Sequence, residues 1–114
     1  FSFKNEGVVE VGIAVSPLDD FEKVKEVSSF CDFIQVMGIK RIGYQGELFD
    51  ENVPEFILKL KDMFPEKIIS VDGGMKPETA EKVFDAGADR VVVGSYILNS
   101  TNPIEAVKEI QSLV

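Results

Sequence analysis

Small and acidic residues follow two successive apolar runs, in the segments 68–74 (IISVDGG) and 90–96 (RVVVGSY). Glycine lets backbone N–H groups approach a ligand closely, and N–H groups at the start of a helix attract the negative charge of a phosphate. A carboxylate beside such a turn can take up or release a proton. The two segments therefore predict a site that holds a phosphate group next to an acid/base side chain.

A purely structural role is the alternative for each of these residues. The glycines can relieve strain at tight turns between strand and helix, and Asp72 can serve as an N-cap or turn carboxylate. The same pattern recurs after two neighbouring runs, which favours phosphate binding by Gly73, Gly74, Gly94 and Ser95.

The composition is that of one globular domain, with 114 residues, 45% apolar and 28% charged. A net charge of −8 argues against binding to the phosphates of a nucleic acid. Cys31 is the single cysteine, which excludes an internal disulfide and points to a reducing, cytoplasmic setting. No apolar run approaches the roughly 20 residues of a membrane span, so we expect no membrane partner.

A short apolar run followed by a turn and an amphipathic helix occurs four times along the chain. The expected strands lie in segments 8–15, 32–39, 67–74 and 89–97. The expected helices lie within 16–30, from about 51 to Pro65, from Pro77 to Gly87, and from Pro103 onward. Their apolar stripes are Phe21, Val24 and Val27; Val53, Phe56, Ile57, Leu60, Met63 and Phe64; Ala80, Val83 and Phe84; and Ile104, Val107 and Ile110.

Strands with near-continuous apolar runs, alternating with helices, indicate an α/β protein with a parallel sheet and right-handed crossovers. Two architectures fit this pattern: an open doubly wound sheet, or an arc of a (β/α)₈ barrel. No G-x-G-x-x-G follows the first run, which removes the strongest reason to prefer a dinucleotide-binding sheet.

Five segments resemble, in order, the C-terminal half of the ribulose-phosphate 3-epimerase family: VGIAVSP, FIQVMGI, GYQGELF, ISVDGGMKPETAEKVFDAGADRVVVGSYI and NPIEAVKEI. The resemblance implies an α/β fold that is the C-terminal half of a (β/α)₈ TIM barrel, with four parallel βα units of the ribulose-phosphate-binding type. Residues 1–114 would form a single half-barrel segment of a larger TIM-barrel domain. Residues 3–7 are typical of the end of a helix, so we expect the chain to begin inside a longer protein.

The same resemblance implies that the complete protein interconverts ribulose 5-phosphate and xylulose 5-phosphate by metal-assisted proton transfer. By resemblance, Asp72 is one of two acid/base carboxylates and also a ligand of a divalent metal (Zn, Fe or Mn). The family's second aspartate and two histidine ligands lie in its first four strands, and this chain has no histidine. We therefore expect the chain alone to bind no metal tightly and to be inactive.

The loop after the second expected strand completes the site that the resemblance implies. Met37 lines the pocket beneath the sugar, although a core methionine is an equal alternative. Further backbone amides for the phosphate come from Gly43, Tyr44, Gln45 and Gly46.

This loop also departs from the family's pattern, which has Thr or Ser at the position of Gly38 and then Pro-Gly-Phe-Gly-Gly-Gln. The departure leaves the identity of the sugar phosphate open. Lys40 and Arg41 are either a cationic contact to the phosphate or a solvated pair.

The expected partners are a phosphorylated pentose and a second polypeptide surface. A four-stranded arc has two open edges and an apolar inner face, which predicts a homo-oligomer or association with the missing half-barrel. Two other functions remain open: a noncatalytic phosphate-binding or self-assembling half-barrel module, and another sugar-phosphate TIM-barrel enzyme, such as a decarboxylase or synthase.

Overall fold

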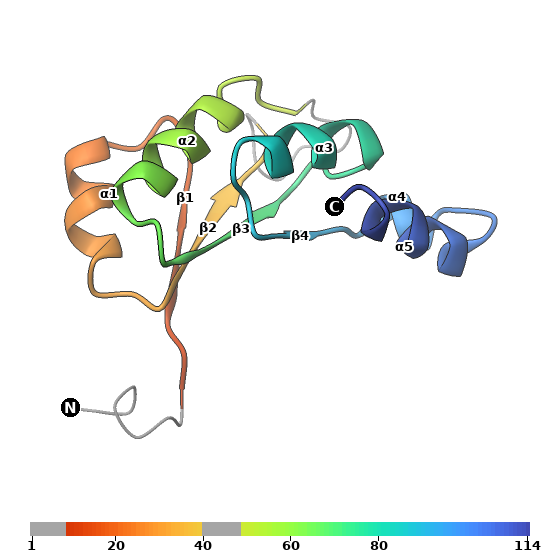
Figure 1. Cartoon of the computed structure of the whole chain (residues 1–114), viewed down its shortest axis with the longest axis horizontal. Coiled ribbons are helices and arrows are strands. Elements are labelled where there is room, and N and C mark those ends of the chain that lie inside the picture. Colours follow the sequence, from red (N-terminus) through yellow and green to blue (C-terminus); the bar gives the residue numbers. More distant parts are fainter. Residues whose placement is uncertain (1–8, 40–48) are drawn as a thin grey trace.

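The computed structural model of the chain describes residues 9–39 and 49–114 (Figure 1). Within these ranges lie four strands: β1 (Gly12–Val15), β2 (Phe33–Met37), β3 (Ile68–Asp72) and β4 (Arg90–Val92). They alternate with α1 (Phe21–Ser28), α2 (Val53–Met63) and α3 (Pro77–Asp85), and α4 (Ser95–Leu98) and α5 (Pro103–Gln111) follow β4.

The strands form one sheet in the order β1-β2-β3-β4, and every neighbouring pair is parallel. Gly12 is in register with Phe33, and Phe33 with Ile68. The predicted α/β class with a parallel sheet is confirmed. Because all strands run the same way, their carboxyl ends meet at one edge of the sheet, where the loops that follow them can build a common site.

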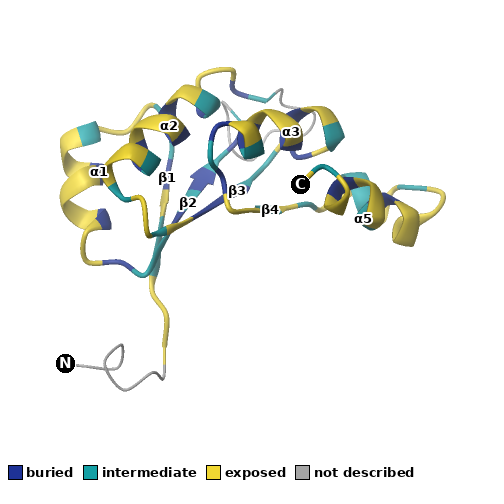
Figure 2. Cartoon of the chain, viewed as in Figure 1, coloured by how far each residue is buried: buried dark blue, intermediate teal, exposed yellow. Residues whose placement is uncertain are grey.

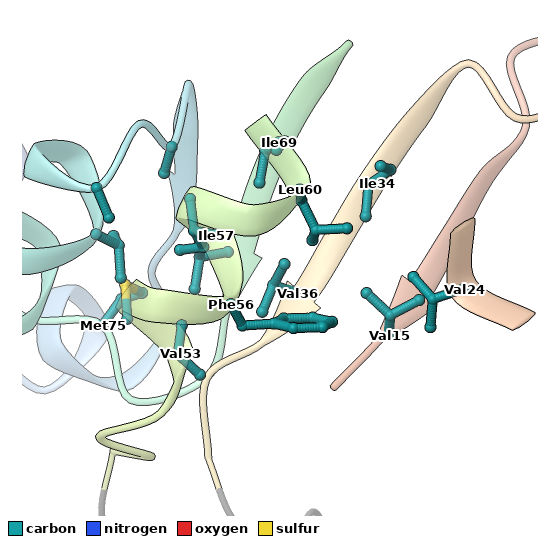
Figure 3. Close-up of a cluster of buried hydrophobic side chains, with 14 residues drawn as sticks. Val15, Val24, Ile34, Val36, Val53, Phe56, Ile57, Leu60, Ile69 and Met75 are labelled. Carbon is teal, nitrogen blue, oxygen red and sulfur yellow. The ribbon is translucent and has the colours of Figure 1, made fainter. Parts of the chain in front are cut away.

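Helices α1, α2 and α3 lie on one side of the sheet and bury its apolar residues (Figure 1). Ile34 and Val36 of β2 are fully buried, as are Ile69 and Val71 of β3. They pack in one cluster with the apolar side of α2, shown in Figure 3, to which Val53, Phe56, Ile57 and Leu60 contribute. Each fully buried branched side chain contributes about 1.5–3 kcal/mol, so this layer holds the strands together.

Helices α3 and α5 begin at Pro77 and Pro103, as expected, and side chains cap two of the helices. The Asp20 carboxylate accepts the Glu22 N–H at the start of α1 (3.0 Å), and the Asn102 side chain accepts the Glu105 N–H at the start of α5 (3.2 Å). Helix α2 ends at Met63, two residues before proline. Figure 2 shows that these helices bury their sheet-facing sides and expose the opposite sides.

Several expectations about single elements were wrong. Val27, Met63 and Ile104 are exposed. The buried sides of α1 and α5 run through Ser28 and Ala106 instead. The first strand begins at Gly12, since its partner strand begins at Phe33. The segment after β4 forms α4, a separate helix of four residues that the sequence did not predict.

The second face of the sheet carries no helix within the described part of the chain and corresponds to the inside of a barrel. Phe33 and Met37 of β2 are half-buried there, and Val92 is 46% exposed. Near the amino ends of the strands, the Phe33 ring covers Gly12 and lies 5.2 Å from the Arg90 guanidinium carbon. The carboxyl ends of β3 and β4 are therefore the part of this face that is open to a ligand.

Asp89 fixes the opposite, amino end of β3. Its Oδ2 accepts hydrogen bonds from Lys61 Nζ (2.7 Å) and from the Ile69 N–H (2.9 Å), and its own N–H donates to the Ile69 carbonyl (2.8 Å). Burial raises the pKa of Asp89, but the hydrogen bonds from Lys61 and Ile69 outweigh that effect and hold it below its ordinary value of 3.8. This one carboxylate joins α2, β3 and the start of β4.

We expect Asp89→Asn to lower the free energy of unfolding by about 1 kcal/mol at neutral pH, because the lost contacts involve a charged group that is 39% exposed. The pKa of Asp89 is lower in the folded than in the unfolded protein, so its ionised carboxylate stabilises the fold at pH values above the unfolded pKa. This stabilisation is lost as the pH falls through the folded pKa. Urea unfolding at neutral pH and near pH 3 should therefore show that acid lowers the free energy of unfolding less in the variant than in the wild type. Asp62→Asn, an exposed change on α2, is the control. If acid lowered the free energy of unfolding equally in the wild type and both variants, the role of Asp89 would be contradicted.

Candidate functional site

A cavity of about 860 Å³ lies at the carboxyl ends of β3 and β4. Asp72, Gly73 and Gly74 line it from the end of β3, and Gly94 and Ser95 line it from the end of β4. The first turn of α3 and the segment before α2 complete its wall. The two small-residue turns predicted to act together therefore face one space.

Asp72 is the last residue of β3 and lies in register with Met37 on β2 and Val92 on β4. Its neighbour Val71 is fully buried under the helices, so the pleat places Asp72 on the inner face. The carboxylate makes no hydrogen bond or ion pair with any described residue. Helix α3 has Lys76 as its N-cap residue, so Asp72 does not cap it.

The turn after Asp72 depends on two glycines and on a close approach from β2. Gly73 and Gly74 have φ values of 101° and 72°, a region that strains any residue with a Cβ atom. The Gly38 N–H donates to the Asp72 carbonyl (2.7 Å), and a Cβ atom at Gly38 would overlap the Gly73 carbonyl oxygen. This contact leaves no room for a side chain at position 38.

The second turn leads directly into α4. The Gly94 carbonyl accepts the N–H groups of Ile97 and Leu98, both at 3.0 Å, so the N–H groups of Ser95 and Tyr96 are in the first turn, where a helix supplies no acceptor. The Tyr96 hydroxyl donates to the Glu109 carboxylate on α5 (2.6 Å), a hydrogen bond that raises the pKa of Tyr96 above its ordinary value of 10.0.

Two lysines line the cavity, Lys76 at the N-cap of α3 and Lys82 in its last turn. Lys82 pairs with Glu51 at 3.6 Å, across the gap between α2 and α3. The Lys76 ammonium group has no carboxylate partner within the part of the chain that the structure describes. Lys76 is therefore a cation available to a negatively charged ligand, a candidate that the sequence interpretation did not include.

The structure brings together five of the predicted site residues. Asp72 and the four small residues of the two turns share the cavity, whereas Met37 lies beside Asp72 in the sheet but is not part of the cavity wall. The predicted contributions of Gly43, Tyr44, Gln45 and Gly46, and those of Lys40 and Arg41, lie outside the described residues.

Sequence interpretation also missed Thr79, a buried residue of the first turn of α3. Its hydroxyl contacts the glycine turn rather than its own helix alone. A threonine three residues after the N-cap position was the available signal.

Comparison with known proteins identifies the family. The model of the ribulose-phosphate 3 epimerase family matches residues 2–98. The chain belongs to this family. The relatives found by sequence comparison include ribulose-phosphate 3-epimerases and a 3-hexulose-6-phosphate synthase, which are named for sugar phosphates.

Individual relatives agree with this assignment. The chain is 31% identical over 107 residues to ribulose-phosphate 3-epimerase from Synechocystis sp., covering 90% of the chain and 46% of that enzyme. It is also 31% identical over 113 residues to the Bacillus subtilis enzyme, covering 95% and 51%. The chain spans about half the length of the curated relatives it matches.

Solved structures establish the architecture. A 3-hexulose-6-phosphate synthase aligns with a TM-score of 0.71 and 24% identity, over 99% of this chain and 53% of that one. The Salmonella typhimurium 3-hexulose-6-phosphate synthase gives a TM-score of 0.72 and 21% identity, over 96% and 51%. The four βα units therefore correspond to half of a TIM barrel, as predicted. Within the described ranges, no helix is long and apolar enough to cross a membrane.

The contact between Gly38 and the turn after Asp72 gives a testable consequence. Gly38→Ala should lower the free energy of unfolding by about 1–3 kcal/mol, because the added methyl group meets backbone atoms that have little room to move. Gly94→Ala is the matched control, since a Cβ atom there has no other atom within 4 Å. Urea unfolding of both variants measures the difference. Equal free energies of unfolding for the two variants would show that the turn does not pack against Gly38.

Proposed function

We propose that the protein to which this chain belongs is a sugar-phosphate epimerase that converts ribulose 5-phosphate to xylulose 5-phosphate. The chain supplies the phosphate-binding half of the site and one catalytic carboxylate, Asp72. The observation that carries the proposal is the cavity that Asp72 shares with the two glycine turns. Membership of the ribulose-phosphate 3-epimerase family supports the same reaction.

The phosphate group would bind between the two turns. Gly73 and Gly74 donate no backbone N–H hydrogen bond to any residue within 9–39 and 49–114, and Ser95 and Tyr96 begin α4. Backbone N–H groups that converge on a small cavity bind a phosphate without needing an arginine. Lys76 adds a positive charge at the rim.

Asp72 would then act on the carbon next to the carbonyl of the bound sugar. The carboxylate takes the proton from that carbon, and the electron pair of the broken C–H bond moves toward the carbonyl to form an enediolate. Inversion requires that a proton return to the opposite face of the carbon. The second acid/base group for that step would come from residues beyond the described half-barrel.

The donor atoms of this chain do not by themselves fit a tightly held divalent metal. Asp72 is a single carboxylate, no cluster of three or more His, Cys, Asp or Glu side chains is present among the described residues, and the whole sequence lacks histidine. Zinc and iron sites ordinarily use three or four protein ligands. A metal therefore enters the proposal only for the complete barrel, with Asp72 as one ligand.

We also propose that residues 1–114 form one half-barrel segment of a larger TIM-barrel domain. The chain covers about half of each relative, and the inner face of its sheet is partly exposed at Ile68 and Val92. A second half-barrel, from the same protein or from another copy, would cover this face and continue the sheet at its open edges.

A synthase acting on a related sugar phosphate is the second candidate. The chain is 28% identical to a 3-hexulose-6-phosphate synthase from Staphylococcus saprophyticus, over 90% of its length. Phosphate binding at the two turns is common to both proposals. Formation of xylulose 5-phosphate, without any change in carbon number, distinguishes the epimerase.

For the complete barrel, we predict that Asp72→Asn slows solvent deuterium incorporation into ribulose 5-phosphate by about 10² to 10⁴, the usual contribution of an acid/base group. Phosphate binding should persist, because the backbone of the turns holds that group. Asp85→Asn, on the exposed end of α3, should exchange at the normal rate.

Near-normal exchange by the Asp72→Asn enzyme would remove Asp72 from the mechanism. The 114-residue chain should catalyse no exchange, with or without zinc, iron or manganese, because the second acid/base group is missing. Exchange by the chain alone would overturn the assignment of half a site to it.

A further inference from the structure

We infer that Thr79 is a positioning residue that holds the Gly73-Gly74 turn in the shape that receives the phosphate group of the substrate. The inference rests on the proposed phosphate site and names the side chain that maintains it. Thr79 lies on α3 and is buried, with 6% of its surface exposed. It lines the same cavity as the turn.

The Thr79 hydroxyl makes contacts on both sides of the segment between β3 and α3. It accepts the Lys76 N–H (3.1 Å) and donates to the Gly74 carbonyl (2.6 Å), with the Lys76 carbonyl more distant at 3.2 Å. A hydroxyl has a single proton, so the shorter contact to Gly74 takes it. The side chain of Lys76, the N-cap residue, has no atom that can accept a hydrogen bond from the first N–H groups of α3. The side-chain acceptor at this end of the helix is therefore the Thr79 hydroxyl, which accepts the Lys76 N–H.

The contact with Gly74 goes beyond what a helix cap requires. Capping concerns the first N–H groups of the helix, whereas Gly74 lies outside α3 and belongs to the left-handed turn. The bond therefore fixes the direction of one peptide plane in that turn. Removing it would leave the turn attached to α3 only through the chain itself.

The carbonyl groups of the turn are all directed toward protein atoms. The Asp72 carbonyl accepts the Gly38 N–H, and the Gly73 carbonyl oxygen lies against Gly38. The Gly74 carbonyl is held by Thr79. In a trans peptide the N–H points opposite to the C=O, and the described peptide bonds include no cis form.

The N–H groups of Gly73 and Gly74 are consequently directed away from Gly38, and both residues line the cavity. Gly38 sets the first two peptide planes of the turn, which carry the N–H groups of Gly73 and Gly74. Thr79 sets the third plane, which carries the N–H group of Met75, another residue of the cavity wall. Without the Thr79 hydroxyl, glycine's wide conformational range would let Gly74 rotate this third plane, so that the turn would no longer hold all its donors toward the cavity. The chemical class that benefits is a phosphate monoester, which accepts several N–H groups at once.

The test is a titration of the chain with inorganic phosphate, followed through the NMR amide signals of Gly73, Gly74 and Ser95. Thr79→Val removes the hydroxyl and keeps the shape, and we expect it to weaken phosphate binding about fivefold to tenfold. Thr79→Ser keeps the hydroxyl and should bind within about twofold of the wild type.

Ser29→Ala is the matched control, because it removes a hydroxyl that donates to a backbone carbonyl (2.7 Å) at the end of α1, away from the cavity. It should leave phosphate affinity unchanged. Affinities are compared at a temperature at which every variant is folded, so that a loss of stability alone does not alter the result.

The outcomes separate the inference from the proposed function. If phosphate leaves Gly73, Gly74 and Ser95 of the wild type unmoved, the phosphate site itself is wrong. If the wild type binds at these amides and Thr79→Val binds equally well, or if Thr79→Ser is as weak as Thr79→Val, only the role of Thr79 is wrong.

The wild-type chain provides a second test if Thr79→Val does not fold. The Lys76 amide hydrogen, which Thr79 accepts, should exchange with solvent more slowly than those of Gly73 and Gly74. Its signal should also move less than theirs when phosphate is added. A Lys76 amide that exchanges as fast as the glycine amides, or that responds most strongly to phosphate, overturns the inference.

Discussion

The parallel register of β2, β3 and β4 is the constraint on which the site depends. Met37, Asp72 and Val92 are paired across the sheet, so the ends of these strands arrive at one edge together. A shift of one residue in β3 would turn Asp72 toward the helices and move Val71 to the inner face. The burial of Ile69 and Val71 under the helices prevents such a shift, and the hydrophobic core thereby determines where the carboxylate points.

The two ends of β3 serve different purposes. At the amino end, Asp89 joins the strand to α2 through Lys61 and to the backbone of Ile69. At the carboxyl end, the Asp72 carboxylate has no partner among the described residues, and the glycine turn presents its N–H groups. This division agrees with TIM barrels in general, in which one face of the barrel supports stability and the other carries the chemistry.

Much of the fold could be predicted from local sequence signals. Apolar runs indicated the strands, and Pro65, Pro77 and Pro103 marked helix boundaries, because these signals act over a few residues. The exposure of Val27 could not be predicted, since it depends on how α1 turns against the sheet. Helix α4 was missed because four residues contain too little periodicity to recognise.

The candidate site was predictable to a similar extent and for similar reasons. Asp72 and the small residues follow apolar runs directly, so their place at strand ends could be inferred. The constraint on Gly38 and the role of Thr79 arise from contacts between the ends of two strands and a helix. Such contacts depend on the tertiary structure, and no short sequence pattern specifies them.

The central claim is that this half-barrel recognises the phosphate group of its ligand through the turns after β3 and β4. The most direct test compares ribulose 5-phosphate with unphosphorylated ribulose by NMR titration of the 114-residue chain. We expect ribulose 5-phosphate to shift the amide signals of Gly73, Gly74, Gly94 and Ser95, to compete there with inorganic phosphate, and to bind far more tightly than ribulose. Equal responses to both sugars, or shifts confined to other parts of the chain, would contradict the claim.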